Sequence, residues 1–369
     1  MKVGLVYNLI KEEMLDGGKP IDAIAEYDTT NTINAIKRSI ELGGHEVVLI
    51  EADETFSENL KKARPDIAFN IAEGLGGECR ESYVPNICET FGIPYTGSGP
   101  LTLSMALDKA RTKEILKQHG IPTAKWQVFN SKNDQIDPSL RFPLIVKLLH
   151  EGSSMGLDQS SVVENEKALK KRVDYLISTY HEPALVEEFL EGREFTIGII
   201  GNEINGKKPW VLPIRETVHE VEKSIVLFDM DDDMVPLVER HKPKDEIDKY
   251  KDENRWKWHS QCPAEITKDM EKELKTLVLS VFKAMGCKDW CRMEIRYKDG
   301  EPYVLELNPI AGIAPGYWFP KTAEVAGYNY DEFVNLILDA AIERLGLQKN
   351  SKDKKGKIMD TVKERLRKA

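Results

Sequence analysis

Long apolar segments are missing from this sequence, which narrows the classes of protein it can belong to. No uninterrupted apolar run reaches the roughly 18 residues that a membrane-spanning helix needs. The N-terminal stretch MKVGLVYNLIKEEM carries two glutamates too early for a secretory signal peptide. We therefore expect a cytoplasmic protein without a membrane partner.

Cysteine is also scarce, and its spacing excludes the common cysteine-based sites. The five cysteines form no CxxC pair and have no histidine nearby at zinc spacing. We expect reduced thiols that mostly pack in the interior, at Cys79, Cys88, Cys262, Cys287 and Cys291. The P-loop pattern GxxxxGK[ST] is absent as well.

The charge balance argues against a nucleic-acid partner. The net charge is -10, which disfavours general binding to a polyanion but still permits a local basic pocket for phosphates. Hydrophobic residues make up 41% and charged residues 31% of the chain, as is typical of a globular protein.

The order of predicted strands and helices indicates an α/β protein with several domains. A chain of 369 residues exceeds the usual single domain of roughly 100 to 200 residues. The first hundred residues alternate strand-like and helix-like segments, which predicts a parallel, Rossmann-like sheet. The helix predicted around 105–119 opens a second unit. We expect domains at 1–101, 102–192 and 193–346, followed by a basic tail at 347–369.

A polar stretch from Thr217 to Gln261 shows little periodicity. Loops longer than roughly 12 to 15 residues are uncommon unless they are functional, so this stretch is a candidate lid over a site.

The segment CRMEIRYKDGEPYVLELN predicts a hairpin that carries three oxygen-bearing side chains. Glu306 and Asn308 are two apart on one strand and share a face. A strict two-residue turn would place Glu294 on the other face, whereas a three-residue turn with left-handed Gly300 brings it to the same face. We expect the three-residue turn and a Mg²⁺ site, the alternative being carboxylates that merely face solvent.

Two further segments are candidates for phosphate and nucleotide binding. HEGSSMGL follows an apolar strand that ends near Lys147, and its small residues would let backbone N–H groups approach a phosphate. In PALVEEFLEGREF a carboxylate could accept hydrogen bonds from ribose hydroxyls. Arg292 is a candidate cation for a developing oxyanion, with a structural salt bridge as the rival interpretation.

Taken in order, DKARTKEIL, IVKLLHEGSSMG, ALVEEFLEGREF, CRMEIRY and LELNPIAG form a recognisable series. Together with GIPYTGSG, this series resembles the ATP-grasp superfamily and, within it, the D-alanine–D-alanine ligase family. The resemblance implies a two-lobed ATP-grasp fold after the Rossmann-like domain, with an α+β character in the ATP-grasp part. It also implies ATP as a substrate and small amino acids as partners, and a homodimer would agree with the dimers that are common in the family.

The resemblance also implies which residues bind ATP and metal. Lysines and acids from the centre of the chain would hold the nucleotide, namely Lys109, Lys147, Glu187, Glu188, Glu194 and Lys249. The implied ligands of Mg²⁺, or of Mn²⁺, are Glu294, Glu306 and Asn308.

Four residues look like the family's catalytic groups. Arg292 resembles the cation that stabilises the tetrahedral intermediate, and Ser153 the loop serine. Gly312 resembles the glycine whose N–H helps to form the oxyanion site, and Tyr250 the tyrosine of a lysine–tyrosine pair in the lid.

Departures from the family pattern gather where amino acids should bind. Glu26 or Asp28 would have to hold the first ammonium, Glu73 stands in place of a histidine, and Glu78 is retained. Cys79 and Arg80 replace an aspartate and a glycine. A small hydroxyl residue that binds the second carboxylate is replaced by Tyr317 or Trp318.

The sequence therefore predicts an ATP-dependent ligase that joins a carboxylate to an amine through an acyl phosphate. D-Alanine for both substrates is the direct form of this hypothesis, and another amino acid or amine is the alternative. A nucleotide-binding relative that has lost catalysis is the competing hypothesis from another functional class.

Overall fold

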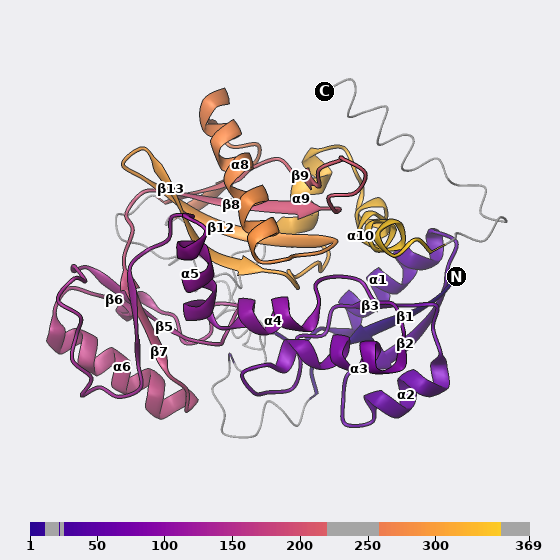
Figure 1. Cartoon of the computed structure of the whole chain (residues 1–369), viewed down its shortest axis with the longest axis horizontal. Coiled ribbons are helices and arrows are strands. Elements are labelled where there is room, and N and C mark those ends of the chain that lie inside the picture. Colours follow the sequence, from indigo (N-terminus) through magenta and orange to yellow (C-terminus); the bar gives the residue numbers. More distant parts are fainter. Residues whose placement is uncertain (12–21, 23–25, 220–257, 348–369) are drawn as a thin grey trace, which may run out of the picture.

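Three sheets organise the chain, and a computed structural model describes them for residues 1–11, 22, 26–219 and 258–347. Figure 1 shows the N-terminal domain in indigo, a small central lobe in magenta and a C-terminal lobe in orange to yellow. Each sheet draws its strands from only one of the ranges expected for the three domains. The α/β fold class predicted from the sequence is confirmed.

The N-terminal domain is a parallel sheet whose central strand is the first in the chain. The order β2-β1-β3 follows from two strand–helix–strand units, as the alternating pattern predicts. In open parallel sheets, binding sites form beyond the carboxyl ends of the strands. The elements are β1 (Lys2–Tyr7), α1 (Thr30–Leu42), β2 (Glu46–Glu51), α2 (Phe56–Ala63), β3 (Ile67–Asn70), the 3₁₀ turn η3 (Arg80–Ser82) and α3 (Tyr83–Phe91).

The single helix expected at 105–119 is wrong, because the structure has two helices there. The first, α4, spans Pro100–Leu107 and the second, α5, spans Lys109–Gln118. Asp108 has an extended backbone, and its side chain accepts a hydrogen bond of 2.9 Å from the Arg111 N–H. An aspartate in this position is a preferred N-cap, so it ends one helix and begins the next.

The small lobe is an antiparallel sheet in the order β4-β7-β5-β6, packed against one long helix. That helix begins after Asn165, whose side chain caps it by accepting the Ala168 N–H. The elements are β4 (Trp126–Phe129), β5 (Leu144–Leu148), β6 (Val162–Val163), α6 (Glu166–Tyr180) and β7 (Ala184–Glu188).

The C-terminal lobe is a larger antiparallel sheet in the order β11-β10-β8-β12-β13, with β9 beside β8. Helix α8 covers it on one side (Figure 1). Its elements are β8 (Arg193–Ile200), β9 (Trp210–Val211), β10 (Arg215–His219), β11 (Trp258–Gln261), α8 (Lys268–Ala284), β12 (Trp290–Lys298), β13 (Glu301–Asn308), α9 (Trp318–Val325) and α10 (Tyr330–Leu345).

The candidate lid is not a loop at its two ends, contrary to the expectation from its weak periodicity. Thr217 and Ser260 are antiparallel partners in β10 and β11. Residues 220–257, between these strands, lie outside the described part of the chain.

In the hairpin β12–β13, Glu294 lies on the same face as Glu306, as expected, but the turn is not the reason. Lys298 pairs with Glu301 across a two-residue turn in which Asp299 and Gly300 both have positive φ, so the three-residue turn is wrong. Further along, the register shifts after Glu294, and Leu305 has no partner of its own on β12. This bulge, rather than the turn, brings Glu294 opposite Glu306.

Helix α10 fastens the N-terminal domain to the C-terminal lobe. The Asn335 amide donates to the Ser39 carbonyl at 2.7 Å, and the Ser39 hydroxyl donates to Asp331 at 2.6 Å. On the same interface, Trp290 is 1% exposed and stacks on Phe69, with ring centroids 6.2 Å apart. These contacts join α1 and β3 of the N-terminal domain to α10 and β12 of the C-terminal lobe.

Among the described residues no helix is both long and apolar enough to cross a bilayer. All five cysteines are free thiols, and Cys88, Cys287 and Cys291 are buried, as expected of packing residues.

Candidate active site

Two cavities meet at the centre of the molecule. The interdomain cavity lies between the N-terminal domain and the C-terminal lobe and contains about 1130 Å³, part of it open to solvent. The interlobe cavity lies between the small lobe and the C-terminal lobe and contains about 790 Å³. Both are lined by Lys109, Gly152, Ser153, Arg292, Glu306 and Asn308. A molecule in one cavity would therefore touch a molecule in the other at these side chains.

The hairpin β12–β13 supplies the polar side chains at this junction. Arg292 is the cross-strand partner of Asn308, and Glu294 of Glu306, so all four lie on one face. The Arg292 Nε donates to Glu294 at 2.9 Å, and the Thr196 hydroxyl donates to the same carboxylate at 2.6 Å. Burial raises the pKa of Glu294 although Arg292 and Thr196 oppose the shift. The sequence placed these residues on one face, and the structure brings them together.

The donor set of this face suits a hard divalent cation. Glu294, Glu306 and Asn308 all line the interlobe cavity and offer carboxylate and amide oxygens, the ligands that Mg²⁺ prefers. The Asn308 Nδ2 is buried without a hydrogen-bond partner. Over the described ranges no three His, Cys, Asp or Glu side chains are grouped at metal-binding distance. The third ligand would therefore have to be the Asn308 amide oxygen.

Two lysines bring positive charge into the interlobe cavity. Lys109, at the first position of α5, lies 3.3 Å from Glu306 and also donates to the Glu151 carbonyl. Lys147, on β5, forms an ion pair with Glu187. Burial disfavours the charged form of Lys147, but Glu187 outweighs this and raises its pKa.

The structure places Glu187 between two lysines. Its side chain is 1% exposed and also pairs with Lys113 at 2.7 Å. Burial alone would raise the pKa of Glu187, but Lys113 and Lys147 lower it to about 2. Lys113 was not singled out from the sequence, because only the packing of α5 on the small lobe brings it to Glu187. The neighbouring Glu188 faces the other side of β7 and accepts the Arg141 N–H at 3.1 Å.

Glu194 lines the interlobe cavity at the start of β8. Its carboxylate is 2.6 Å from Arg296, and the residue is 8% exposed. A buried acid at a cavity wall can accept hydrogen bonds from hydroxyls of a bound molecule.

The serine loop, residues 150–157, separates the two cavities. Ser153 and Ser154 both have positive φ, of 48° and 59°, which is strained for residues with a side chain and is characteristic of functional sites. Glu26 accepts the Gly152 N–H at 2.9 Å, and a Cβ at this glycine would lie only 2.7 Å from the same carboxylate. From the other side Arg172 donates to the Gly156 carbonyl.

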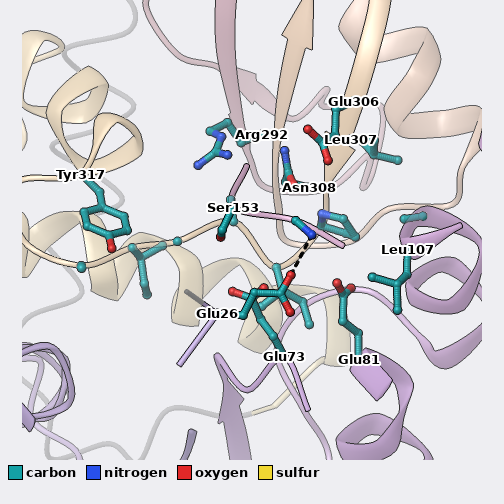
Figure 2. Close-up of a pocket in the computed structure, with 18 of the residues that line it drawn as sticks. Glu26, Glu73, Glu81, Leu107, Ser153, Arg292, Glu306, Leu307, Asn308 and Tyr317 are labelled. Carbon is teal, nitrogen blue, oxygen red and sulfur yellow. Dashed lines mark hydrogen bonds between the residues drawn. The ribbon is translucent and has the colours of Figure 1, made fainter. Parts of the chain in front are cut away.

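One wall of the interdomain cavity is acidic. Glu26 and Asp28 follow β1, and Glu73 and Glu81 follow β3, as expected for the carboxyl ends of parallel strands. Figure 2 shows Glu26, Glu73 and Glu81 on one side of the cavity, with Arg292 and Asn308 on the opposite side. Burial raises the pKa of Asp28 to about 7 and that of Glu81 to about 8.

Arg80 lies behind this acidic wall. It donates to Glu26 at 2.6 Å and to Glu151 at 2.8 Å. Although burial disfavours its charge, these two acids raise the pKa of Arg80 further. Glu26, the residue expected to bind an ammonium, is thus already ion-paired.

An aromatic pair, Tyr317 and Trp318, also lines the interdomain cavity. Gly312 lies against Tyr317, since a Cβ on the glycine would be 2.9 Å from the tyrosine ring. Trp318 also lines the cavity, and the Arg215 guanidinium stacks on its ring at 3.4 Å. Arg215 is 2% exposed, and its NH2 group has no hydrogen-bond partner. This buried arginine was not predicted, and its position in a strand of mixed polarity offered little signal.

Among the predicted residues that the structure describes, Glu78, Glu187 and Glu188 line neither cavity. Glu78 is exposed on the loop after β3 and is not a lining residue. Lys249 and Tyr250 lie outside the described residues.

Comparison of the chain with known proteins shows the family to which it belongs. The model of the D-ala D-ala ligase C-terminus matches residues 115–339, more than half of the chain. The chain belongs to the D-alanine–D-alanine ligase family. A D-alanine–D-alanine ligase of Carboxydothermus hydrogenoformans is 31% identical over 85% of this chain and 93% of that protein. One from Haemophilus influenzae is 30% identical over 89% of this chain and 100% of the relative.

Other matches extend this family relationship. An uncharacterised protein of Sinorhizobium fredii is 30% identical over 84% of this chain and 87% of that protein. Among solved structures, D-alanine–D-alanine ligase from Bacillus anthracis complexed with ATP superposes with a TM-score of 0.68. That match has 22% identity and covers 93% of this chain and 98% of the other, so it supports the ATP-grasp fold.

Proposed function

We propose that this protein is an ATP-dependent ligase that joins the carboxylate of one amino acid to the amine of another. The observation that carries the proposal is the junction of the two cavities at Lys109, Ser153, Arg292 and Glu306. ATP would occupy the interlobe cavity and the amino acids the interdomain cavity. Family membership supports the same reaction, and the relatives named D-alanine–D-alanine ligase give its direct form.

The reaction has two steps, each of which fits a feature of the junction. A carboxylate oxygen attacks the γ-phosphorus of ATP, and the bond between this phosphorus and the β,γ-bridging oxygen breaks. ADP departs, and the substrate becomes an acyl phosphate. The amine nitrogen then attacks the acyl carbon, the bond to phosphate breaks, and the nitrogen loses a proton. Lys109 and Lys147 would position the phosphates, and Arg292 would stabilise the oxyanion that develops at the acyl carbon.

Other residues at the junction hold the reacting groups in place. The Ser153 loop would cover the phosphates, and the Gly312 N–H would donate to the same oxyanion. Glu194 would accept hydrogen bonds from the ribose. Glu187 would act through Lys147, since its carboxylate is buried behind that lysine rather than at the cavity wall.

Glu294, Glu306 and Asn308 would hold Mg²⁺. When bound, the metal would neutralise phosphate charge and polarise the γ-phosphoryl group. The substrates are expected to be small amino acids or similar amines, and the side chains of Tyr317 and Trp318 occupy part of the cavity wall that would face them.

The direct test is phosphate release from ATP and Mg²⁺ with D- and L-amino acids, singly and in pairs, followed by mass spectrometry of the products. Turnover should produce ADP, phosphate and one amide in equal amounts. The absence of phosphate release and of a condensed product with every pair would contradict the proposal and favour the non-catalytic relative.

A matched pair of variants tests the junction itself. Loss of a residue that hydrogen-bonds to a metal ligand typically lowers activity by roughly 10- to 100-fold. Glu306→Gln changes a proposed ligand itself, so it should lower turnover by more than this, with an unchanged circular dichroism spectrum. Glu301→Gln, at the exposed start of the same strand, is the control and should keep full activity. Full activity in Glu306→Gln would remove the proposed metal site.

A further inference from the structure

The acidic wall of the interdomain cavity has more carboxyl groups than the surrounding cations pair with. Four carboxyls line it, namely Glu26, Asp28, Glu73 and Glu81. The nearest cation on this side is Arg80, which is engaged by Glu26, by Glu151 and by the His150 carbonyl. The printed ion pairs of Arg80 are thus with Glu26 and Glu151, and its charge only partly offsets the effect of burial on the pKa of Glu73 and Glu81.

The three carboxyls of the wall other than Glu26 lack a hydrogen-bond donor in the part of the chain that the structure describes. Within the described ranges, no hydrogen bond reaches the side chains of Asp28, Glu73 or Glu81. Glu81 is only 9% exposed, and Figure 2 shows its carboxylate directed into the cavity beside Glu73. Leaving a buried carboxylate without a donor is unfavourable, because it loses its hydration and gains nothing in return.

The burial of these carboxyls also favours a cationic ligand. Burial is the first cause of the raised pKa of Glu73 and of Glu81, and the neighbouring Glu26 raises both further. Removing water from adjacent carboxyls makes each harder to ionise unless a cation is present. A cationic ligand that bound here would stabilise the ionised form of these carboxyls and lower their pKa.

The cavity is also polarised along its length. Arg292 lies opposite the acidic wall (Figure 2), and Arg292 and Lys109 provide positive charge at the junction with the interlobe cavity. A ligand with a carboxylate at one end and positive charge at the other would match both sides. One ammonium group can neutralise only one of three such carboxyls.

Building on the proposed ligase function, we propose that the acid which this enzyme activates is a diamino monocarboxylic acid. Its carboxylate faces Arg292 and the serine loop, and its two ammonium groups bind Asp28, Glu73 and Glu81. A neutral amino acid of the same length lacks the second ammonium and leaves one more carboxyl of the wall without a partner.

The test compares 2,4-diaminobutyrate with 2-aminobutyrate, each as both enantiomers, because the two differ only in the second ammonium group. Hydroxylamine serves as the amine, so that the natural acceptor need not be known. Its nitrogen attacks the acyl phosphate, phosphate leaves, and a hydroxamate forms that is measured as its iron(III) complex. One charge-assisted hydrogen bond corresponds to about 10- to 100-fold in kcat/KM, and we expect the diamino acid to be favoured by this factor.

Variants of the wall locate the effect. Glu81→Gln and Asp28→Asn should each reduce the preference for the diamino acid at least several-fold. Glu78→Gln is the matched control, because it removes the same charge from the same loop at an exposed residue outside the cavity, and it should keep the preference. Calorimetry of both amino acids without ATP measures the same preference in binding alone.

The outcomes separate this inference from the proposed function. Hydroxamate formation with equal or better use of 2-aminobutyrate would overturn the diamino acid and leave the ligase standing. Selective calorimetric binding of 2,4-diaminobutyrate without hydroxamate or ADP would support the acidic wall and contradict the ligase. If the diamino acid shows no binding and no turnover, the inference is overturned.

Discussion

Glu187 and its two lysines offer the sharpest test of how charge is held in the small lobe. The carboxylate is 1% exposed and contacts both Lys113 and Lys147, which come from α5 and β5. Glu187→Gln keeps the shape of the side chain and removes its charge. It leaves two lysines in the interior with no carboxylate between them, which is far more costly than losing an exposed ion pair.

The size of the effect follows from the pKa of Glu187. The lysines lower it from 4.5 to about 2 against the effect of burial, and a shift of about 2.5 units corresponds to roughly 3 kcal/mol. Removing one partner of a buried pair costs about 3–5 kcal/mol, which agrees. Because the folded-state pKa is the lower one, this stabilisation is complete above pH 4.5 and is lost as the pH falls towards 2.

Urea unfolding followed by circular dichroism measures this effect. At pH 7 Glu187→Gln should lower the free energy of unfolding by about 3 kcal/mol, and the difference from wild type should narrow at pH 3. Glu188→Gln is the control on the same strand, facing the other side, and should change stability by less than about 0.5 kcal/mol. Equal stability of the two variants at pH 7, or a gap that is unchanged in acid, would refute the reasoning.

Two more predictions concern groups outside the cavities. Asp108 and Glu182 raise the pKa of His150 to about 9, so its stabilisation is complete below pH 6.5 and is lost as the pH rises through 9. His150→Gln should therefore destabilise by about 1–2 kcal/mol at pH 6 and by much less at pH 10; an NMR titration of the ring near its ordinary pKa would contradict this. Gly43→Ala should lower the free energy of unfolding by about 1–3 kcal/mol, because its Cβ would lie 2.0 Å from the Asn335 side chain. Calorimetric unfolding unchanged by this substitution would show that α1 and α10 can separate at no cost.

Local patterns predicted the elements and the polar face of the hairpin. Alternation of two along β13 placed Glu306 and Asn308 together, and motif order indicated the fold. The cause of the register was missed, because a bulge at Leu305 depends on how β12 also pairs with β8 and leaves no signature in composition.

The partners of the buried acids depend on long-range contacts, which residue spacing does not predict. Glu26 or Asp28, with Glu73 and Glu78, was expected near an amino-acid substrate, whereas Glu81 was not predicted. Only the structure shows that Arg80 engages Glu26 and that Glu81 lines the cavity. Likewise the sequence suggested a nucleotide role for Glu187, whereas its partner Lys113 lies 74 positions earlier and meets it only through packing.

The docking of α10 on α1 has a consequence for how this enzyme could change its specificity. The proposed metal ligands and Arg292 lie on one hairpin, whereas the acidic wall belongs to loops of a separate domain that packs on the C-terminal lobe through the α10 interface. Loops after β1 and β3 could be exchanged between homologues as a cassette, provided that Ser39, Gly43 and Asn335 are kept. Such grafts would alter which acid is selected and leave the residues proposed for phosphoryl transfer unchanged. Natural divergence and laboratory recombination could therefore change specificity by the same exchange of loops.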